Sequence, residues 1–281
     1  MLYPENLSSQ ISIDEVSVSQ GELYTFVTSK LGRGKKRTII ASIKGTKAKD
    51  IINVLSKIPE ASRNQVKEVT LDMAKNMESS IKNSFLKADI VTDRFHVVKL
   101  VIDALQHIRI KHRWAEIDQE NKMLSLAKKE GLQYSQRLLS NGDSFKQLLA
   151  RSRYILAKNS KTWTKNQEER SVLLFREFPV LKKAYNHVMC FRNIYENQSK
   201  EKARQQFEDW IIKSESLGIN EFNSSANSIK YHLDNILNFF NNRNTNANAE
   251  SFNAKIKLFR ANQRGVVDTK FFLFRLQNLF A

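Results

Sequence analysis

Apolar and polar positions alternate with a period of two along the first forty residues, which is the pattern of β-strands with one buried face. The first two alternating segments are separated by Gln20-Gly21, a residue pair that suits a hairpin turn. Successive strands of this kind are most simply arranged antiparallel to their neighbours. The pattern therefore predicts antiparallel strands over 11–18, 23–29 and 37–43.

The apolar spacing changes to helical intervals after Gly45 and predicts a helix over 48–57, ahead of Pro59. The pattern then predicts a strand over 66–71, a helix over 74–86 and a strand over 89–92. The two strands of such a unit are parallel, because the helix brings the chain back to the end from which the first strand started. Open sheets of this kind carry ligand chemistry at the carboxyl ends of their strands, which is where Asp72 and Asp93 stand.

Long helical patterns rich in Lys, Arg, Gln and Leu replace the alternation from Val97 to about Phe240. A run of asparagines then interrupts the pattern, and asparagine favours turns and helix caps over helix interiors. A last helix is therefore expected over about 247–264, ahead of Gly265. The prediction is an α/β protein in three parts, which are a first core segment over 1–104, a large all-helical insertion over 105–240, and a last core segment over 241–281.

The last predicted helix is amphipathic. Phe252, Ile256 and Phe259 recur at i, i+4 and i+7 and form an apolar stripe. The opposite side is predicted to carry the polar residues Glu250, Asn253, Lys257 and Arg264. A carboxylate that is turned away from the core and surrounded by cations is free to meet a metal ion and a phosphate.

The charge balance indicates a polyanionic partner. Among 281 residues, 46 are Lys or Arg and 29 are Asp or Glu, which gives a formal net charge of +17. Nucleic acid fits this charge first and an anionic membrane surface second. No apolar stretch approaches the roughly 18–20 residues of a membrane-spanning helix, and residues 1–9 lack the layout of a signal peptide, so we expect a cytoplasmic protein. The single cysteine, Cys190, excludes an internal disulfide and a zinc site built on paired thiolates.

Three carboxylates far apart in the sequence are candidates for metal-dependent chemistry. Asp14 lies on the first predicted strand, Asp72 ends the fourth, and Glu250 lies near the start of the last helix. Phosphodiester cleavage by two divalent ions needs acidic ligands on rigid elements. Taken singly, each carboxylate is more often a cap, turn or surface residue than a ligand. The order of the elements, however, matches the RNase H-like fold, whose first and fourth strands lie side by side and would make Asp14 and Asp72 neighbours.

Four segments of the chain have distinctive residue patterns, namely Ile13-Asp14-Glu15, Val69-Thr70-Leu71-Asp72-Met73-Ala74, Val91-Thr92-Asp93-Arg94-Phe95-His96-Val97-Val98-Lys99 and Asn248-Ala249-Glu250-Ser251-Phe252-Asn253-Ala254-Lys255-Ile256-Lys257. Together they resemble the DDE transposases of bacterial insertion sequences, in the subgroup with an Asp-Arg-Phe-His-Val motif. The resemblance covers the chain from about Ser12 to its end.

The resemblance implies an RNase H-like mixed sheet interrupted by a helical insertion, and metal-dependent attack on DNA phosphates. Carried over residue by residue, it implies that Asp14, Asp72 and Glu250 are the catalytic residues and the metal ligands, with Mg²⁺ as the ion and Mn²⁺ as an alternative. A rival assignment replaces Asp14 by Asp93, which also ends a strand. We prefer Asp14, because the fold needs its first ligand on the central first strand. Asp93 and His96 then become accessory residues that support the site or contact DNA, although His96 could equally be a buried core histidine.

The resemblance also implies the partners. These are double-stranded DNA at the transposon ends and at the target, and we expect a homodimer or larger assembly because two ends must be held together. The cations that are predicted to contact DNA are Arg94, Arg109, Arg113, Lys257 and Arg260. The loop Gly32-Arg33-Gly34-Lys35-Lys36 lacks the Gly-Lys-Ser/Thr ending and the following helix of a nucleotide-binding phosphate loop, so we interpret it as a basic hairpin tip.

Two departures from the family pattern affect the prediction. Leu86-Lys87-Ala88 stands where relatives usually have a Pro-Asn-Ala turn, which changes a turn and leaves the chemistry alone. Many relatives carry an amino-terminal zinc-binding and helix-turn-helix region; we expect that region to be missing here, and either a separate protein to supply DNA recognition or this to be a shortened copy. Two other functions stay open, namely an RNase H-like nuclease without strand transfer and an inactive DNA-binding remnant.

Overall fold

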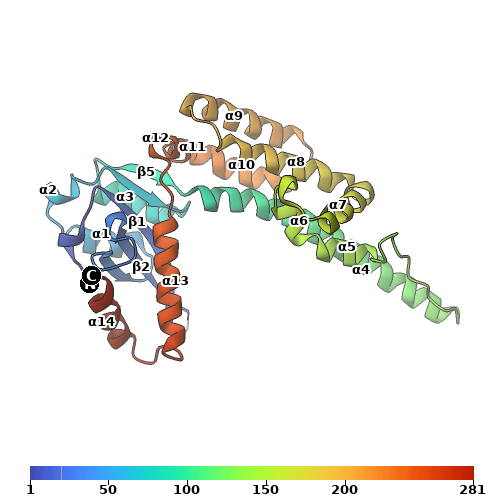
Figure 1. The fold of residues 1–281 in the computed structure, drawn as a ribbon, viewed down its shortest axis with the longest axis horizontal. Helices are drawn as coiled ribbons and strands as arrows, with labels where there is room; N and C mark the ends of the chain where they lie inside the picture. The colour runs from blue at the N-terminus through green and yellow to red at the C-terminus, as the bar shows by residue number, and fades with distance from the viewer. Residues whose placement is uncertain (20) are drawn as a thin grey trace. The chain divides into compact units, whose positions relative to one another are not determined.

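The computed structural model describes residues 1–19 and 21–281 and divides them into two compact units (Figure 1). The first, here called the sheet unit, combines residues 1–97 with 232–281. The second, the helical unit, comprises residues 98–231, whereas the sequence prediction divided the chain after 104 and after 240. The protein is thus an α/β protein in which an RNase H-like core carries a helical insertion.

A five-stranded mixed sheet forms the centre of the sheet unit. Its strands are β1 (Gln10–Ser19), β2 (Glu22–Ser29), β3 (Ile39–Lys44), β4 (Glu68–Leu71) and β5 (Asp89–Thr92), in the order β3-β2-β1-β4-β5. The first three strands pair antiparallel, and β4 runs parallel to both β1 and β5. The first and fourth strands are therefore neighbours, as in the RNase H-like layout. Of the predicted hairpin turn, Gln20 lies outside the described residues.

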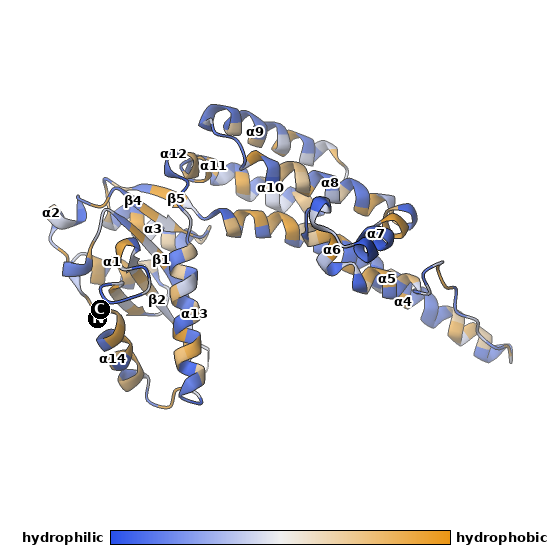
Figure 2. Cartoon of the chain, viewed as in Figure 1, coloured by the Kyte–Doolittle hydropathy of each residue, from blue (hydrophilic) through white to orange (hydrophobic). Residues whose placement is uncertain are grey.

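Helices cover both faces of this sheet. They are α1 (Ala48–Leu55), α2 (Glu60–Arg63), α3 (Lys75–Ser84), α11 (Leu233–Leu237), α12 (Phe239–Asn242), α13 (Ala247–Asn262) and α14 (Thr269–Phe280). Alternate strand residues point to opposite faces. Ile11 and Ile13 accordingly belong to a core that includes residues of α1 and α3. Val16 and Val18 belong to a second core with residues of α13 and α14, and Figure 2 shows that α13 carries hydrophobic and hydrophilic residues in turn.

Two element ends differ from the prediction because of backbone conformation. β3 begins at Ile39 and not at residue 37, since Arg37 has a φ of 64°, in the left-handed region that extended strands exclude. The last long helix ends at Asn262. Arg264 and Gly265 follow it with φ values of 55° and 111°, so the chain turns away from the helix axis and continues into α14.

The helical unit is built around aromatic side chains. Phe191, Phe207 and Trp210 are buried, and the ring of Phe191 contacts those of the other two. Its helices are α4 (Arg94–Lys129), which starts in the sheet unit, α5 (Phe145–Arg151), α6 (Arg153–Ala157), α7 (Lys165–Glu177), α8 (Pro179–Ile194), α9 (Lys200–Ser216) and α10 (Glu221–Tyr231). Among the described residues, none of the helices combines the length and the apolar character that crossing a membrane requires.

Candidate active site

Three aspartates lie in one row across the parallel strands of the sheet unit. Continued by two residues, the register between β1 and β4 sets Asp14 opposite Asp72. Continued by one residue, the register between β4 and β5 sets Asp72 opposite Asp93. Side chains in one row of a sheet point to the same face. This is the face that α13 covers, because Asn253 of α13 forms a hydrogen bond with Asp14.

Asp14 and Asp72 are each held by hydrogen bonds from protein donors. The backbone N–H of Glu15 donates to Oδ1 of Asp14 (2.8 Å), and Nδ2 of Asn253 donates to its Oδ2 (2.7 Å). The backbone N–H of Ala74 donates to Oδ1 of Asp72 (2.9 Å). Burial raises the pKa of Asp14, and the nearby charge of Asp72 raises it further, against the effect of the bond from Glu15. Two carboxylates that repel each other in this way form a favourable place for a cation.

The amino-terminal end of α13 is joined to the end of β5 through Asp93. This side chain is 1% exposed, and its Oδ1 accepts a hydrogen bond from the backbone N–H of Asn246 (3.0 Å). Its Oδ2 lies 3.0 Å from Nδ1 of His96 in the first turn of α4. The backbone N–H of Glu250 donates to the carbonyl of Asn246 (2.9 Å) as α13 begins. Asp93 therefore holds in place both the turn that carries His96 and the helix that carries Glu250.

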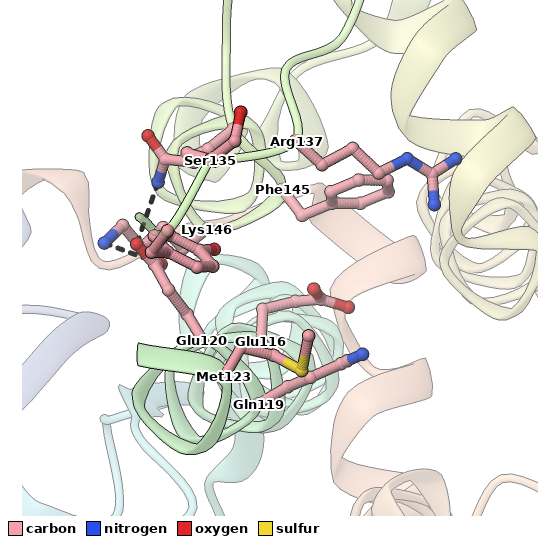
Figure 3. Close-up of a pocket in the computed structure, with 11 residues that line it drawn as sticks. Glu116, Gln119, Glu120, Met123, Ser135, Arg137, Phe145 and Lys146 are labelled. Atoms are coloured by element: carbon pink, nitrogen blue, oxygen red, sulfur yellow. Dashed lines mark hydrogen bonds and ion pairs between the residues drawn. The ribbon is translucent and has the colours of Figure 1, made fainter. Parts of the chain in front are cut away.

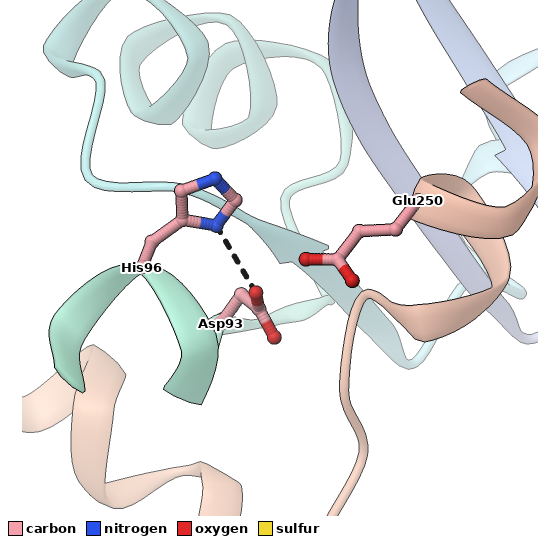
Figure 4. A group of neighbouring side chains, drawn as sticks. All are labelled: Asp93, His96 and Glu250. Carbon is pink, nitrogen blue, oxygen red and sulfur yellow. Dashed lines mark hydrogen bonds and ion pairs between the residues drawn. The ribbon is translucent and has the colours of Figure 1, made fainter. Parts of the chain in front are cut away.

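Asp93, His96 and Glu250 form a compact group of potential ligands (Figure 4). One ligand atom from each lies within 4.8 Å of the other two, and residues 1–19 and 21–281 contain no second group of three that meets this criterion. The hydrogen bond with Asp93 raises the pKa of His96. Burial raises the pKa of Glu250, and the charge of Asp93 adds to that effect. In Figure 4 the Glu250 carboxylate is directed toward the Asp93–His96 pair.

The five side chains Asp14, Asp72, Asp93, His96 and Glu250 are here called the acidic site. The negative charges of Asp93, Asp72 and Asp14 all raise the pKa of His96, so the aspartate pair adjoins the group around Glu250. Among these described residues, however, the ligand atoms of Asp14, Asp72 and Glu250 do not all lie within 4.8 Å of one another. Glu250 thus forms a group with Asp93 and His96, the two charges that act on its pKa, and not with the two aspartates with which the sequence grouped it.

Comparison with known proteins gives this arrangement a family. A family model described as Transposase, of the ISL3 group of DDE enzymes, matches residues 11–276. The chain belongs to this transposase family. It is similar to the transposase for insertion sequence element IS1001 of Bordetella parapertussis, with 22% identity over 272 residues. That match covers 96% of this chain, and the chain spans 60% of the length of that curated relative. No solved structure matches the transposase significantly.

The cations that were predicted to contact DNA differ in their exposure in the transposase. Arg113 and Lys257 are exposed, and Arg94 is half-buried. Arg260 is also half-buried, and its Nη1 donates to the backbone carbonyl of Ser17 on β1 (3.1 Å). Arg113 and Lys257 are thus the most accessible of this set.

The positions of two polar residues differ from the prediction. Arg109 is 6% exposed and its Nη1 donates to the backbone carbonyl of Leu149 (3.0 Å), so its guanidinium belongs to the interior of the helical unit and not to a DNA surface. Asn253 is 9% exposed and turns toward Asp14, although the helical pattern had set it on the outward face. The sequence showed the apolar stripe of α13, but it did not show that Asp14 on the sheet would be a polar partner for Asn253 at the edge of that stripe.

A buried polar network beside the acidic site was not predicted. Lys30 and Glu68 are 8% and 4% exposed; Nζ of Lys30 lies 3.3 Å from Oε1 of Glu68 and also donates to Thr70. Oε2 of Glu68 accepts from Nδ2 of Asn242 (3.2 Å) and of Asn244 (2.9 Å). The network ties the segment ahead of α13 to β4. The available signal was the alternation of polar residues along β4, a strand whose residues are all buried.

A separate cavity of about 330 Å³ lies in the helical unit, between α4 and the segment ahead of α5 (Figure 3). Glu120 forms an ion pair with Lys146 (2.7 Å), and the guanidinium of Arg137 lies 4.9 Å from the ring centre of Phe145. Burial raises the pKa of Glu116, which also lines the cavity. The lining includes no residue of the acidic site, so we do not assign the chemistry to it.

The donor set of the acidic site fits a hard divalent cation. Four carboxylates and one imidazole converge there, and oxygen-rich sites suit Mg²⁺ and Mn²⁺. Oδ1 of Asn253 is buried and accepts no hydrogen bond from the residues that the structure describes, so a further oxygen beside Asp14 is free to face a cation. The residues present are therefore compatible with a magnesium or manganese site.

Proposed function

We propose that the transposase cuts DNA phosphodiester bonds at the ends of an insertion sequence and joins the freed ends to target DNA, with Asp14, Asp72 and Glu250 as ligands of Mg²⁺ or Mn²⁺. The observation that carries the proposal is the alignment of Asp14 and Asp72 on adjacent strands, on the face covered by the helix that brings Glu250. Membership of the transposase family supports the reaction class.

The proposed reaction has two phosphoryl-transfer steps. In the first, a water oxygen bonds to phosphorus while the bond to the 3′-oxygen breaks, which leaves a 3′-hydroxyl and a 5′-phosphate. In the second, this 3′-hydroxyl oxygen bonds to a target phosphorus, and the target's own 3′-oxygen leaves. A bound divalent ion would lower the pKa of the attacking group and neutralise phosphate charge. Asp14 and Asp72 contribute by being fixed before the substrate arrives, through bonds from Glu15, Asn253 and Ala74.

Asp93 and His96 have supporting roles in this proposal. Asp93 is almost fully buried between the backbone N–H of Asn246 and the ring of His96, so it positions His96 and the start of α13, whereas the more exposed Asp14 is proposed as the ligand. The raised pKa of His96 keeps its ring protonated to a higher pH than an ordinary histidine, and the protonated ring is a donor for a phosphate oxygen. The exposed Arg113 and Lys257, with Arg94 and Arg260, are proposed to contact the DNA backbone.

The test is cleavage of labelled DNA that carries the terminal sequences flanking the gene, with Mg²⁺ and with a second, unlabelled target duplex. We expect nicked ends followed by joined molecules, and we expect Asp72→Asn to abolish both. Asp89→Asn is the matched control, because Asp89 is exposed at the opposite end of a parallel strand and should leave both products unchanged.

The other outcomes identify the alternatives. Cleavage without joined molecules would make the protein an RNase H-like nuclease, and DNA binding without any cleavage would favour an inactive remnant. Activity that appears only after addition of a second protein from a neighbouring reading frame would support a separate DNA-recognition partner. Sedimentation of the protein on end DNA tests the proposed dimer or larger assembly, and a complex with a single chain would contradict it.

A further inference from the structure

The loop between β2 and β3 in the sheet unit concentrates positive charge. Within residues 32–37, here called the basic loop, Arg33, Lys35, Lys36 and Arg37 are all exposed. None of these four side chains forms an ion pair or hydrogen bond with another residue in the part of the chain that the structure describes. Neighbouring like charges without anionic partners repel one another. The loop therefore carries four cations that no described residue neutralises.

The backbone of the basic loop is nevertheless fixed. The N–H of Lys35 donates to the carbonyl of Gly32 (2.8 Å), and the hydroxyl of Thr38 donates to the carbonyl of Lys35 (2.6 Å). Nζ of Lys255 donates to the carbonyl of Gly34 (2.6 Å). Lys255 belongs to α13, so this bond attaches the loop to the helix of the acidic site. A loop held in one conformation loses little entropy when it binds a ligand.

Two arginines of the basic loop occupy backbone conformations that arginine disfavours. Arg33 and Arg37 have φ values of 48° and 64°. Glycine and asparagine adopt the left-handed region far more readily than a long side chain does. Backbone strain of this type is found most often at functional sites, where the position of the side chain matters more than its local conformational energy. Arg243 has the same conformation, but its guanidinium lies over the ring of Phe239 and so has a structural partner.

The position of the basic loop suits a ligand that also enters the acidic site. Lys255 follows Glu250 by five residues on α13, which is about 7–8 Å along the helix axis at roughly 1.5 Å per residue. Phosphates of one DNA strand follow at about 3.4 Å along the duplex axis. The axial separation of Glu250 and Lys255, the residue that holds the loop, therefore corresponds to about two nucleotide steps of one DNA strand.

We propose that the basic loop is a preformed binding site for the phosphodiester backbone of duplex DNA. Arg33, Lys35, Lys36 and Arg37 contact phosphates next to the scissile bond and contribute affinity that does not depend on base sequence. Phosphate contacts fix the position of a duplex without reading its sequence, so the proposed role of the loop is to hold the duplex against the acidic site. This inference rests on the proposed function, because it takes the DNA that is cut as the ligand.

The test measures binding of a labelled duplex of about 30 base pairs in EDTA, which excludes cleavage, across a series of salt concentrations. Each lost phosphate contact lowers the slope of log Kd against log salt by about 0.9. Arg33→Gly with Arg37→Gly should lower that slope by about two and weaken binding about tenfold or more at 0.1 M salt. The melting temperature should stay the same or rise, because glycine accepts the left-handed conformation without strain.

Three further variants separate charge from folding. Arg33→Lys with Arg37→Lys keeps the charge and should retain the salt dependence. Lys35→Gln with Lys36→Gln removes charge from residues without positive φ and should reproduce the loss. Lys47→Gln with Lys49→Gln is the matched control, because both are exposed at the start of α1, whose apolar residues pack on the opposite face of the sheet, and should leave the slope unchanged.

Three outcomes would contradict the inference. An unchanged slope in the Gly and Gln variants of the loop would overturn it, as would an equal loss in the α1 control. Loss of binding to anionic vesicles with full retention of duplex binding would assign the loop to a membrane and also overturn it. Failure of the proposed function is distinguishable, because cleavage is measured separately in Mg²⁺, whereas the binding assay in EDTA requires no cleavage.

Discussion

Asp14 and Asp93 lie on the same face of the sheet in different surroundings. Asp93 is 1% exposed, and its two oxygens face the backbone N–H of Asn246 and the ring of His96. Asp14 also accepts hydrogen bonds at both oxygens, from the backbone N–H of Glu15 and from Nδ2 of Asn253, but it is only half-buried. Each oxygen keeps a second lone pair after accepting one hydrogen bond, and a ligand also needs access, so the difference in exposure favours Asp14 over Asp93 as the ligand.

Amide substitution at the two positions should therefore have unequal effects. We expect Asp14→Asn to abolish cleavage, whereas Asp93→Asn should reduce the rate about 10- to 100-fold, as loss of a residue that orients ligands usually does. The measurement is the initial cleavage rate over a range of Mg²⁺ concentrations. Asp93→Asn should regain part of the rate at high Mg²⁺. Complete loss in Asp93→Asn together with a working Asp14→Asn would instead make Asp93 the ligand.

His187 makes the helical unit sensitive to acid. It is 3% exposed, its ring stacks on Trp210 at 4.5 Å, and its Nε2 lies 2.7 Å from Oγ of Ser214. Burial lowers the pKa of His187 to about 4. The unfolded chain, with an ordinary pKa near 6.5, therefore binds a proton that the folded chain rejects between these two values. Stability from this residue is present above pH 6.5 and is lost as the pH falls toward 4.

We predict that lowering the pH from 7.5 to 5 destabilises the helical unit by about 2 kcal/mol through His187. His187→Phe should remove most of this dependence, since it does not titrate and since the hydroxyl of Ser214 keeps its bond to the carbonyl of Trp210. The free energy of unfolding in denaturant at the two pH values gives the measurement. His107→Gln is the control, because His107 is exposed. Equal pH dependence in wild type and His187→Phe would contradict the assignment.

At the scale of elements, α13 depends on bonds that precede it. Its first turn is held by Asp93, and the segment ahead of it is held by Glu68 through Asn242 and Asn244. Glu68 is in turn paired with the buried Lys30. Because Glu250 lies in the first turn, small movements of this segment move a proposed ligand. The network thus connects the packing of β4 with the geometry of the acidic site.

Substitutions at Glu68 should separate its effect on the unfolding free energy from its effect on the position of the segment ahead of α13. Glu68→Ala leaves Lys30 buried without its partner, and we expect a loss of about 3–5 kcal/mol in unfolding free energy. The double change Lys30→Met with Glu68→Leu should recover most of that loss, yet leave Asn242 and Asn244 without their acceptor. Hydrogen exchange over 241–249 should then accelerate and cleavage should slow, while denaturant unfolding stays near wild type. Wild-type exchange and cleavage in the double variant would contradict the positioning role.

The predictable part of the fold lies in elements with a clear period. The alternation along β1 and β2 and the apolar stripe of α13 were sufficient to find those elements to within a few residues. The start of β3 was missed because the left-handed conformation of Arg37 depends on the loop around it, not on a propensity of arginine. The burial of Arg109 was missed for a similar reason, since only tertiary packing brings the carbonyl of Leu149 to it.

The sequence indicated which carboxylates are candidates for the site, but not which of them lie closest together. Asp72 and Asp93 end strands that the sequence showed to be parallel, so their proximity followed from topology. The row that they form with Asp14 depends on the register between β1 and β4, which packing decides. The placement of Glu250 near Asp93 and His96 depends on the bond from Asn246 to Asp93, which no local pattern reveals.

At the scale of the whole molecule, the two units have separate cores, and we expect one to respond to a metal ion and the other to acid. The acidic site lies in the sheet unit, whereas His187 lies in the helical unit. The three tryptophans of the chain, Trp114, Trp163 and Trp210, all belong to the helical unit. Tryptophan fluorescence therefore reports the unfolding of one unit, while far-ultraviolet circular dichroism reports both.

We predict that Mg²⁺ and acid act on different unfolding transitions. A ligand that binds only the folded sheet unit stabilises it by about 2.7 kcal/mol at a concentration of 100 Kd. Mg²⁺ should thus raise the midpoint temperature of the unfolding transition that circular dichroism reports and fluorescence does not. Asp72→Asn should abolish this rise. Lowering the pH to 5 should instead lower the midpoint temperature of the transition that fluorescence reports, because His187 lies in the helical unit. Mg²⁺ could instead raise the midpoint temperature of the fluorescence transition by the same amount. In that case either the two units would unfold as one cooperative body or the ion would bind in the helical unit. Either result would contradict independent unfolding of the two units.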